Sequence, residues 1–208
     1  MRERETCKDL VLLVADKDMA YAVSGVLHRT KSLGIRDITE RIYVHPERDP
    51  GCLLWGHDFL RPFLNQYSHA IVLLDHHGSG NEQLGPEELE MRVEKNLSNS
   101  GWGSRAAAIV IAPELEVWVW SDSPHVEAVL GWERRQPDLR TWLGQEGLID
   151  PSRAKPDRPK QAMEEALRFA RKPRSSSLYG ELAKQVSLQH CTDRAFERLK
   201  TLLQAWFP

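Results

Sequence analysis

Four short apolar segments, each followed by helical periodicity, constrain the fold of this chain more than any other feature. They are LVLLVA at Leu10–Ala15, an alternating segment at Ile38–His45, AIVLL at Ala70–Leu74 and AAAIVIA at Ala106–Ala112. Unbroken apolar runs of this length are typical of strands buried on both faces of a parallel sheet. Strands that alternate with helices indicate βαβ units. We therefore expect an α/β fold with a mainly parallel four-stranded sheet flanked by helices.

From about residue 123 onwards the chain shows only helical patterns, so we expect two parts. Residues 1–123 form the α/β core, and residues 124–208 form a helical C-terminal portion packed on it. The 208 residues are enough for one ordinary domain with a small appendage. In the second part, Asp193 is expected to cap the last helix.

Several residues in the predicted core are typical of the first or last positions of helices. Asp18 is expected to cap the helix after the first strand, and Gly34 stands where that helical segment ends. After a polar loop, HPERDPGC, Asp58 is expected to cap a helix that continues to Tyr67. Pro86 is expected in the first turn of the helix that follows the third strand.

Composition and charge limit the classes of protein to which the chain can belong. Hydrophobic residues make up 41% and charged residues 28%, which suffices for a core and excludes a disordered chain. No apolar run reaches the ~18 residues of a spanning helix, so we expect no membrane partner. Lys plus Arg number 28 and Asp plus Glu 30, which gives a net charge of −2. A nucleic-acid partner would therefore have to meet a local basic patch.

The cysteines and the N-terminal segment predict a cytoplasmic protein. Cys7, Cys52 and Cys191 are odd in number and lack C-x-x-C spacing, which favours free thiols in a reducing compartment. The segment MRERETCKDLVLL has neither an apolar stretch of signal length nor a small-residue cleavage site.

Acidic residues follow three of the predicted strands at the point where each strand ends. Asp16 follows the first strand, Asp75 ends the third, and Glu116 follows the fourth. Because ligand sites of open parallel sheets lie beyond the carboxyl ends of the strands, we expect these side chains in one crevice. Carboxylates gathered there repel one another unless a cation lies between them, and oxygen ligands suit Mg²⁺ or Mn²⁺. The pattern predicts a site in which the metal polarises a phosphoryl group and activates water.

The segment DHHGSG after the third strand adds further candidates. His77 lies two residues from Asp75 and is expected on the same side, as a metal ligand or proton carrier. Gly78 and Gly80 allow the backbone to approach a phosphate group closely. Local structure also accounts for these residues, with Asp16 as a helix cap, His77 as an exposed loop residue and the glycines as turn formers.

Basic residues are concentrated in the connector SRAKPDRPK and the helix after it. Lys155, Arg158 and Lys160 are the candidates for contacts with a nucleic-acid backbone, because lysine and arginine neutralise phosphates. The alternative is the solvated face of an amphipathic helix.

These motifs together resemble the Toprim-like fold, and more closely a group of small bacterial Toprim-related proteins with a P-x-x-E-x-W element. That element stands here as Pro113, Glu116 and Trp118. The C-terminal half also contains the segments that accompany it, namely KPDRPK, SSSLYGELAKQVSL and CTDRAFERLKTLL. The resemblance covers most of the chain.

The resemblance implies a metal site and a biological context. Toprim domains of topoisomerases, primases and nucleases hold Mg²⁺ with a Glu after the first strand and a D-x-D after a later one. Here Asp75 matches the first Asp, His77 occupies the second Asp position, and Asp16 stands in, displaced by one residue, for the Glu. Relatives of this sort occur in bacterial antiphage defence gene clusters, including a methylation-associated system.

Three functions follow as hypotheses. The first is a Mg²⁺- or Mn²⁺-dependent nuclease in antiphage defence that acts on nucleic acid, DNA in preference to RNA, with Asp16, Asp75, His77 and Glu116 as its catalytic residues. The second is a catalytically degenerate Toprim-like subunit that contacts other defence-system proteins. The third is a nucleotide sensor at the DHHGSG loop.

Overall fold

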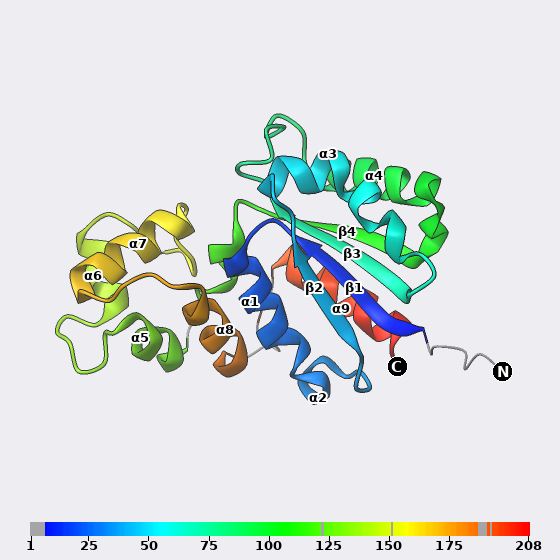
Figure 1. Cartoon of the computed structure of the whole chain (residues 1–208). Coiled ribbons are helices and arrows are strands. Elements are labelled where there is room, and N and C mark those ends of the chain that lie inside the picture. The colour runs from blue at the N-terminus through cyan, green and yellow to red at the C-terminus, as the bar shows by residue number, and fades with distance from the viewer. Residues whose placement is uncertain (1–6, 122, 151, 187–190, 192) are drawn as a thin grey trace.

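A computed structural model describes residues 7–121, 123–150, 152–186, 191 and 193–208. It contains a four-stranded sheet in the order β2-β1-β3-β4, and all neighbouring strands are parallel. The strands are β1 (Lys8–Val14), β2 (Glu40–Val44), β3 (Tyr67–Asp75) and β4 (Ala106–Ile111). The predicted α/β class with a parallel four-stranded sheet and flanking helices is thus confirmed (Figure 1).

Helices cover both faces of the sheet. On one face lie α3 (Arg48–Leu60) and α4 (Pro86–Leu97), and on the other lie α1 (Lys17–Leu27) and α9 (Arg194–Trp206) (Figure 1). Residues 10–14 of β1 and 70–74 of β3 are fully buried between these layers, because their side chains alternate between two apolar helix layers. A short helix, α2 (Thr30–Leu33), ends at Gly34 in the left-handed conformation, as predicted.

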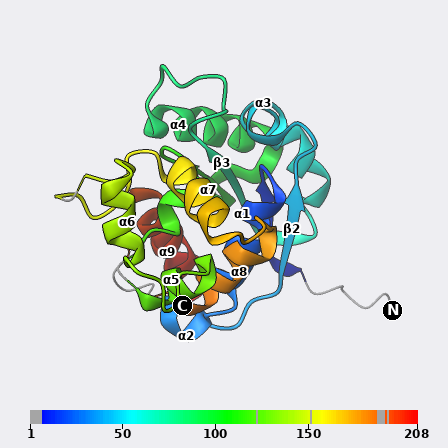
Figure 2. The same cartoon turned by 90° about the vertical axis from the view of Figure 1, so that its left-hand side faces the viewer.

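The remaining helices lie beyond the carboxyl ends of the strands (Figures 1 and 2). They are α5 (Pro124–Leu130), α6 (Leu139–Gln145), α7 (Pro159–Ala170) and α8 (Ser176–Gln185). Short helical turns occupy η1 (Arg61–Phe63), η2 (Ser98–Trp102), η3 (Gly103–Arg105) and η4 (Leu115–Trp118).

Two helices of the C-terminal portion return to the core. α8 packs along α1 so closely that a Cβ at Gly25 would lie 2.9 Å from the Gly180 carbonyl oxygen. Glycine is required there because any side chain would separate the two helices. α9 packs on β4, and Asp193 caps it by accepting from the Phe196 N–H at 3.1 Å, as predicted.

The helix predicted from Asp58 to Tyr67 is wrong. α3 begins at Arg48 and ends at Leu60, and Tyr67 is the first residue of β3. The segment HPERDPGC was expected to be a loop because it contains proline and glycine, yet Pro50 lies in the first turn, where no partner for its nitrogen is needed. Gly51 is also required, since a Cβ there would lie 2.0 Å from His45 Nδ1.

Side chains of α4 and α9 close the outer edge of β4. The backbone N–H groups of Ala108 and Val110 donate to Glu94 and Glu90 of α4, at 3.0 and 2.9 Å. The carbonyl oxygens of the same two strand residues accept from arginines of α9, Arg198 and Arg194, at 3.2 Å each. An edge strand that would otherwise present unpaired backbone groups is thereby satisfied.

No helix in the part of the chain that the structure describes is both long and apolar enough to cross a membrane. The three cysteines are free thiols, of which Cys52 is buried in the core and Cys7 is exposed.

Candidate metal centre

Two of the predicted ligands lie at the ends of neighbouring strands. β1 pairs with β3. Asp16 follows the end of β1, and Asp75 is the last residue of β3. Asp16 is also the N-cap of α1, where one carboxylate oxygen accepts from the Met19 N–H at 2.9 Å. Capping uses one oxygen of Asp16 and leaves the other for a further interaction.

A third acid, Asp49, joins them from the first turn of α3. Its Oδ1 accepts from the backbone N–H of Asp75 at 2.8 Å, which ties the start of α3 to the end of β3. Burial and the Asp16 carboxylate raise the pKa of Asp49. Sequence reasoning missed this residue because the segment that carries it was expected to be a loop.

The side chain of Asp75 is electrostatically unsatisfied. Its Oδ1 is inaccessible to solvent and has no hydrogen-bond partner, although the residue as a whole is only partly buried. Burial raises its pKa well above the ordinary value, and four other carboxylates add to the shift, namely Asp49, Glu116, Asp16 and Glu114. Desolvation and like charges both oppose ionisation of this group, so a cation beside it would be strongly favoured.

The acids after β4 are held by the C-terminal portion. Glu114 accepts from the backbone N–H of Lys160 at 3.1 Å. Glu116 is 3% exposed, and its Oε1 accepts from the Tyr179 hydroxyl at 2.6 Å and from Arg174 at 3.2 Å. Burial raises the pKa of Glu116, while the Tyr179 hydrogen bond and the charges of Lys160 and Arg174 oppose the increase. Of the predicted ligands, Glu116 is the one that the protein itself already pairs.

The predicted cap at Asp18 is wrong, because Asp16 occupies the N-cap position. Asp18 instead forms an ion pair with Arg174 at 2.8 Å and accepts from the Ser176 hydroxyl at 2.6 Å. This contact joins the start of α1 to the start of α8.

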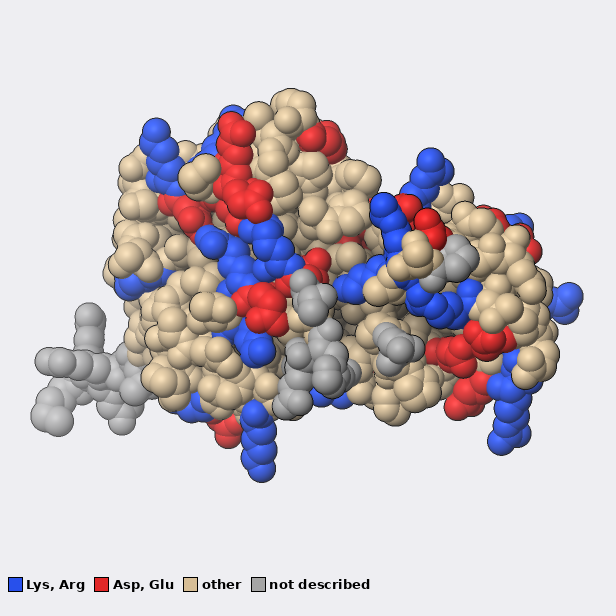
Figure 3. Space-filling view, turned by 180° about the vertical axis from the view of Figure 1, so that it is seen from behind, with Lys and Arg blue, Asp and Glu red and all other residues tan. Residues whose placement is uncertain are grey.

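A polar cleft of about 620 Å³ opens beside these acids. Acids and cations share its lining, which includes Asp16, Asp18, Arg48, Lys160 and Arg174. Across the back of the molecule, basic and acidic side chains are likewise interleaved rather than separated into one basic field (Figure 3).

The three predicted phosphate-binding residues are separated in the structure. Lys160 lines the polar cleft and contributes its charge to Asp49 and Glu116. Arg158 is exposed, and its guanidinium donates to Gln161 at 3.4 Å. Lys155 is partly buried, and its Nζ donates to the Val117 carbonyl at 2.8 Å, away from the cleft. Only Lys160 therefore accompanies the acids.

The DHHGSG loop keeps its backbone groups occupied. His77 is exposed, and its backbone N–H donates to the Pro113 carbonyl at 2.9 Å, whereas its ring forms no hydrogen bond or ion pair with an acid in the described residues. The N–H groups of Gly78 and Gly80 both donate to Glu82, at 2.9 and 3.2 Å. A phosphate at this loop would have to displace the Glu82 carboxylate.

The carboxylates at this edge of the sheet are chemically suited to bind a hard divalent cation. All the acids supply oxygen atoms, the kind of ligand that Mg²⁺ and Mn²⁺ prefer, and Asp75 Oδ1 lacks a partner. Within the described ranges, however, no three His, Cys, Asp or Glu side chains are already grouped closely enough to hold an ion. A cation would have to draw the carboxylates together.

The fold and these residues define the chain as a parallel α/β protein with several carboxylates and a polar cleft at the carboxyl edge of its sheet. Comparisons with protein-family models, with curated proteins and with solved structures find no match in any of the three sets.

Proposed function

We propose that the chain is a Mg²⁺- or Mn²⁺-dependent, Toprim-like nuclease of a bacterial antiphage defence system, and that it acts on nucleic acid, DNA in preference to RNA. The observation that carries the proposal is the environment of Asp75. Its Oδ1 is buried without a partner, and four other carboxylates raise its pKa. Perturbed acids at the carboxyl edge of a parallel sheet are characteristic of functional sites.

Asp75, Asp49 and Asp16 would hold the cation. Asp49 already contacts the backbone of Asp75, and Asp16 lies on the neighbouring strand end. When bound, the ion would supply positive charge for a phosphodiester and a more acidic water molecule. Glu116 accepts from Tyr179 and Arg174, so it would stabilise the structure beside the site and would not bind the ion directly.

Cations in the adjoining cleft supply a place for the phosphate backbone. Lys160 and Arg48 line the cleft, and neither forms an ion pair among the described residues. A phosphodiester held by these side chains would lie beside Asp16, because all three line the same cleft.

The test is cleavage of single-stranded and double-stranded DNA, and of RNA, with Mn²⁺ or Mg²⁺ added. We expect metal-dependent cleavage by the wild-type protein and a loss of at least about 100-fold in Asp75→Asn, since each group that stabilises such a transition state contributes that much. Asp58→Asn removes an exposed acid of α3, the helix that also carries Asp49, and should cleave normally. Equal cleavage by a folded Asp75→Asn protein would contradict the proposal.

A second function is favoured by a specific observation. The described carboxylates are not grouped around a common point, and Glu116 is already neutralised by Arg174. A metal-free Toprim-like subunit that contacts other defence-system proteins would have this arrangement. Absence of both cleavage and Mn²⁺ binding in the folded wild-type protein would favour this second function over the first.

A further inference from the structure

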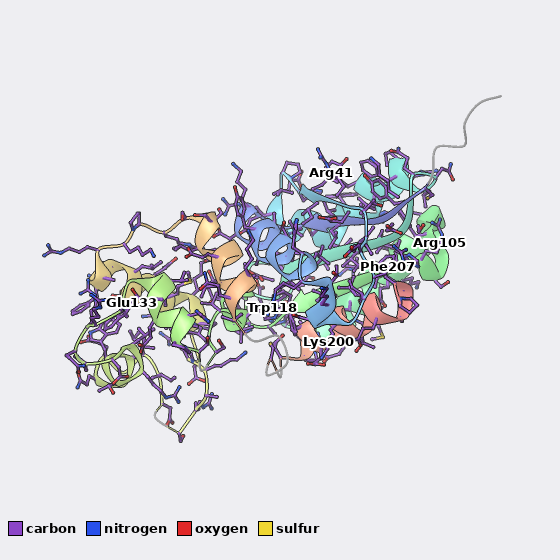
Figure 4. All side chains as sticks on the ribbon, turned by 90° about the horizontal axis from the view of Figure 1, so that it is seen from below. Arg41, Arg105, Trp118, Glu133, Lys200 and Phe207 are labelled. Atoms are coloured by element: carbon purple, nitrogen blue, oxygen red, sulfur yellow. The ribbon has the colours of Figure 1, made fainter. Side chains whose placement is uncertain are left out.

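A second cavity shares no described lining residue with the polar cleft beside Asp16. It has a volume of about 690 Å³ and is lined by residues of α1, η4, α6, α8, α9 and the connector before α7. Its walls are mainly apolar and include Val26, Trp118, Tyr179, Leu182 and Phe196. Trp118 lies where the core meets the helical portion (Figure 4).

The size of this cavity distinguishes it from a packing defect. Protein interiors contain few voids larger than a water molecule, whereas ligand pockets have volumes of about 300–1,000 Å³. The cavity falls in the second range. Aromatic walls from separate elements, such as Trp118 of η4, Tyr179 of α8 and Phe196 of α9, offer flat surfaces to an apolar guest.

Two cations line the same cavity, and neither forms an ion pair in the part of the chain that the structure describes. Lys155 donates through Nζ to the Val117 carbonyl at 2.8 Å. Arg140 donates to the carbonyl oxygens of Ala154 and Arg153. Carbonyl groups satisfy hydrogen bonds but do not neutralise charge, so both side chains keep their attraction for an anion.

We propose that this cavity binds an amphipathic small molecule with an apolar body and one anionic group. The apolar body would lie against Trp118, Tyr179 and Phe196, and the anionic group would lie at Arg140 and Lys155. The cavity therefore differs in chemistry from the polar cleft beside Asp16, whose lining mixes acids with cations and includes no Trp, Tyr or Phe among the described residues. The binding proposal does not depend on the nuclease proposal, since it is measured with neither metal nor nucleic acid.

The test uses 1-anilinonaphthalene-8-sulfonate, a fluorescent probe with an aromatic body and one sulfonate. We expect saturable binding of one probe molecule per chain, with energy transfer from tryptophan to the bound probe. Decanoate should displace the probe, and decan-1-ol should do so about tenfold less well, because it lacks the charge. Equal displacement by both competitors would contradict the proposed anionic site.

Variants locate the bound probe. Ala154 is exposed and lines the cavity, so Ala154→Trp fills the cavity from a surface position and should abolish binding. The pair Arg140→Gln and Lys155→Met should weaken binding about tenfold while keeping the apolar walls. The matched control, Arg92→Gln with Lys95→Met, removes two exposed cations from α4 and should bind normally.

Each variant is checked by circular dichroism, and the two cavity variants test the proposal independently if one of them fails to fold. Absence of saturable binding to the wild-type protein would overturn the proposal. Unchanged affinity in a folded cavity variant would overturn it as well, because the probe would then bind elsewhere.

Discussion

Two groups of carboxylates contact the same sheet, but their surroundings differ. At the outer edge of β4, Glu90 is 2% exposed and accepts from the Val110 N–H at 2.9 Å and from Arg194 at 2.9 Å. At the carboxyl edge, Asp75 has a buried oxygen with no partner and lies among four other acids. The chain thus supplies a compensating cation to Glu90, whereas the buried oxygen of Asp75 has none.

The difference separates structural acids from candidate functional ones. A paired acid such as Glu90 completes the hydrogen bonds of an edge strand, so it serves to stabilise the fold. An acid such as Asp75, held where desolvation and like charges oppose ionisation, makes no such contribution. Burial alone therefore does not identify a site, whereas an unpartnered carboxylate oxygen surrounded by other acids makes Asp75 a candidate.

The largest effect on stability is expected from the replacement of Glu90. Glu90→Leu leaves Arg194 without its main partner and exposes the edge of β4, because both Oε1 and Oε2 of Glu90 accept from that arginine. We expect the free energy of unfolding to fall by about 3 kcal/mol, measured by urea denaturation, because the buried Val110 N–H loses its acceptor and Arg194 loses two charge-assisted hydrogen bonds. Glu87 also pairs with Arg194 but is exposed, so Glu87→Gln should change stability by less than about 1 kcal/mol. Similar losses in the two variants would contradict this account of Glu90.

Replacement of Asp75 is expected to have a smaller effect on stability, and to raise it. The folded protein raises the pKa of Asp75, so its contribution to stability is full below about pH 4 and is lost as the pH rises through the folded-state pKa. Asp75→Asn should therefore be more stable than the wild-type protein at pH 8, by about 1–3 kcal/mol. Urea denaturation at pH 4 and pH 8 measures this, and a variant that is less stable than the wild type at pH 8 would contradict it.

The smallest effect is expected at the amino end of β1. Asp9 accepts from Arg36 at 2.6 Å and from the Thr39 N–H at 2.8 Å, and these contacts lower its pKa to about 2. Its contribution to stability is present above about pH 4 and is lost as the pH falls through 2. Asp9→Asn should cost about 1 kcal/mol at pH 7 after solvent screening. This cost should disappear on acidification, and a cost that is equal at pH 7 and pH 2 would contradict the assignment.

The sequence predicts the sheet better than it predicts the site. Apolar runs such as Leu10–Ala15 identify buried strands because burial on both faces excludes polar residues. Asp49 was missed because Pro50 and Gly51 have loop character, although both fit the first turn of α3. The bond from Tyr179 to Glu116 joins residues 63 positions apart, and local patterns carry no information about such a contact.

The most direct test of the proposed metal centre is a calorimetric titration with Mn²⁺ of the wild-type, Asp75→Asn and Asp58→Asn proteins. If Asp75, Asp49 and Asp16 form a metal site, the wild-type protein and Asp58→Asn should bind Mn²⁺ saturably, and Asp75→Asn should lose that binding. Absence of binding in the wild-type protein, or equal binding in Asp75→Asn, would contradict the assignment of a metal centre to the carboxyl edge of the sheet.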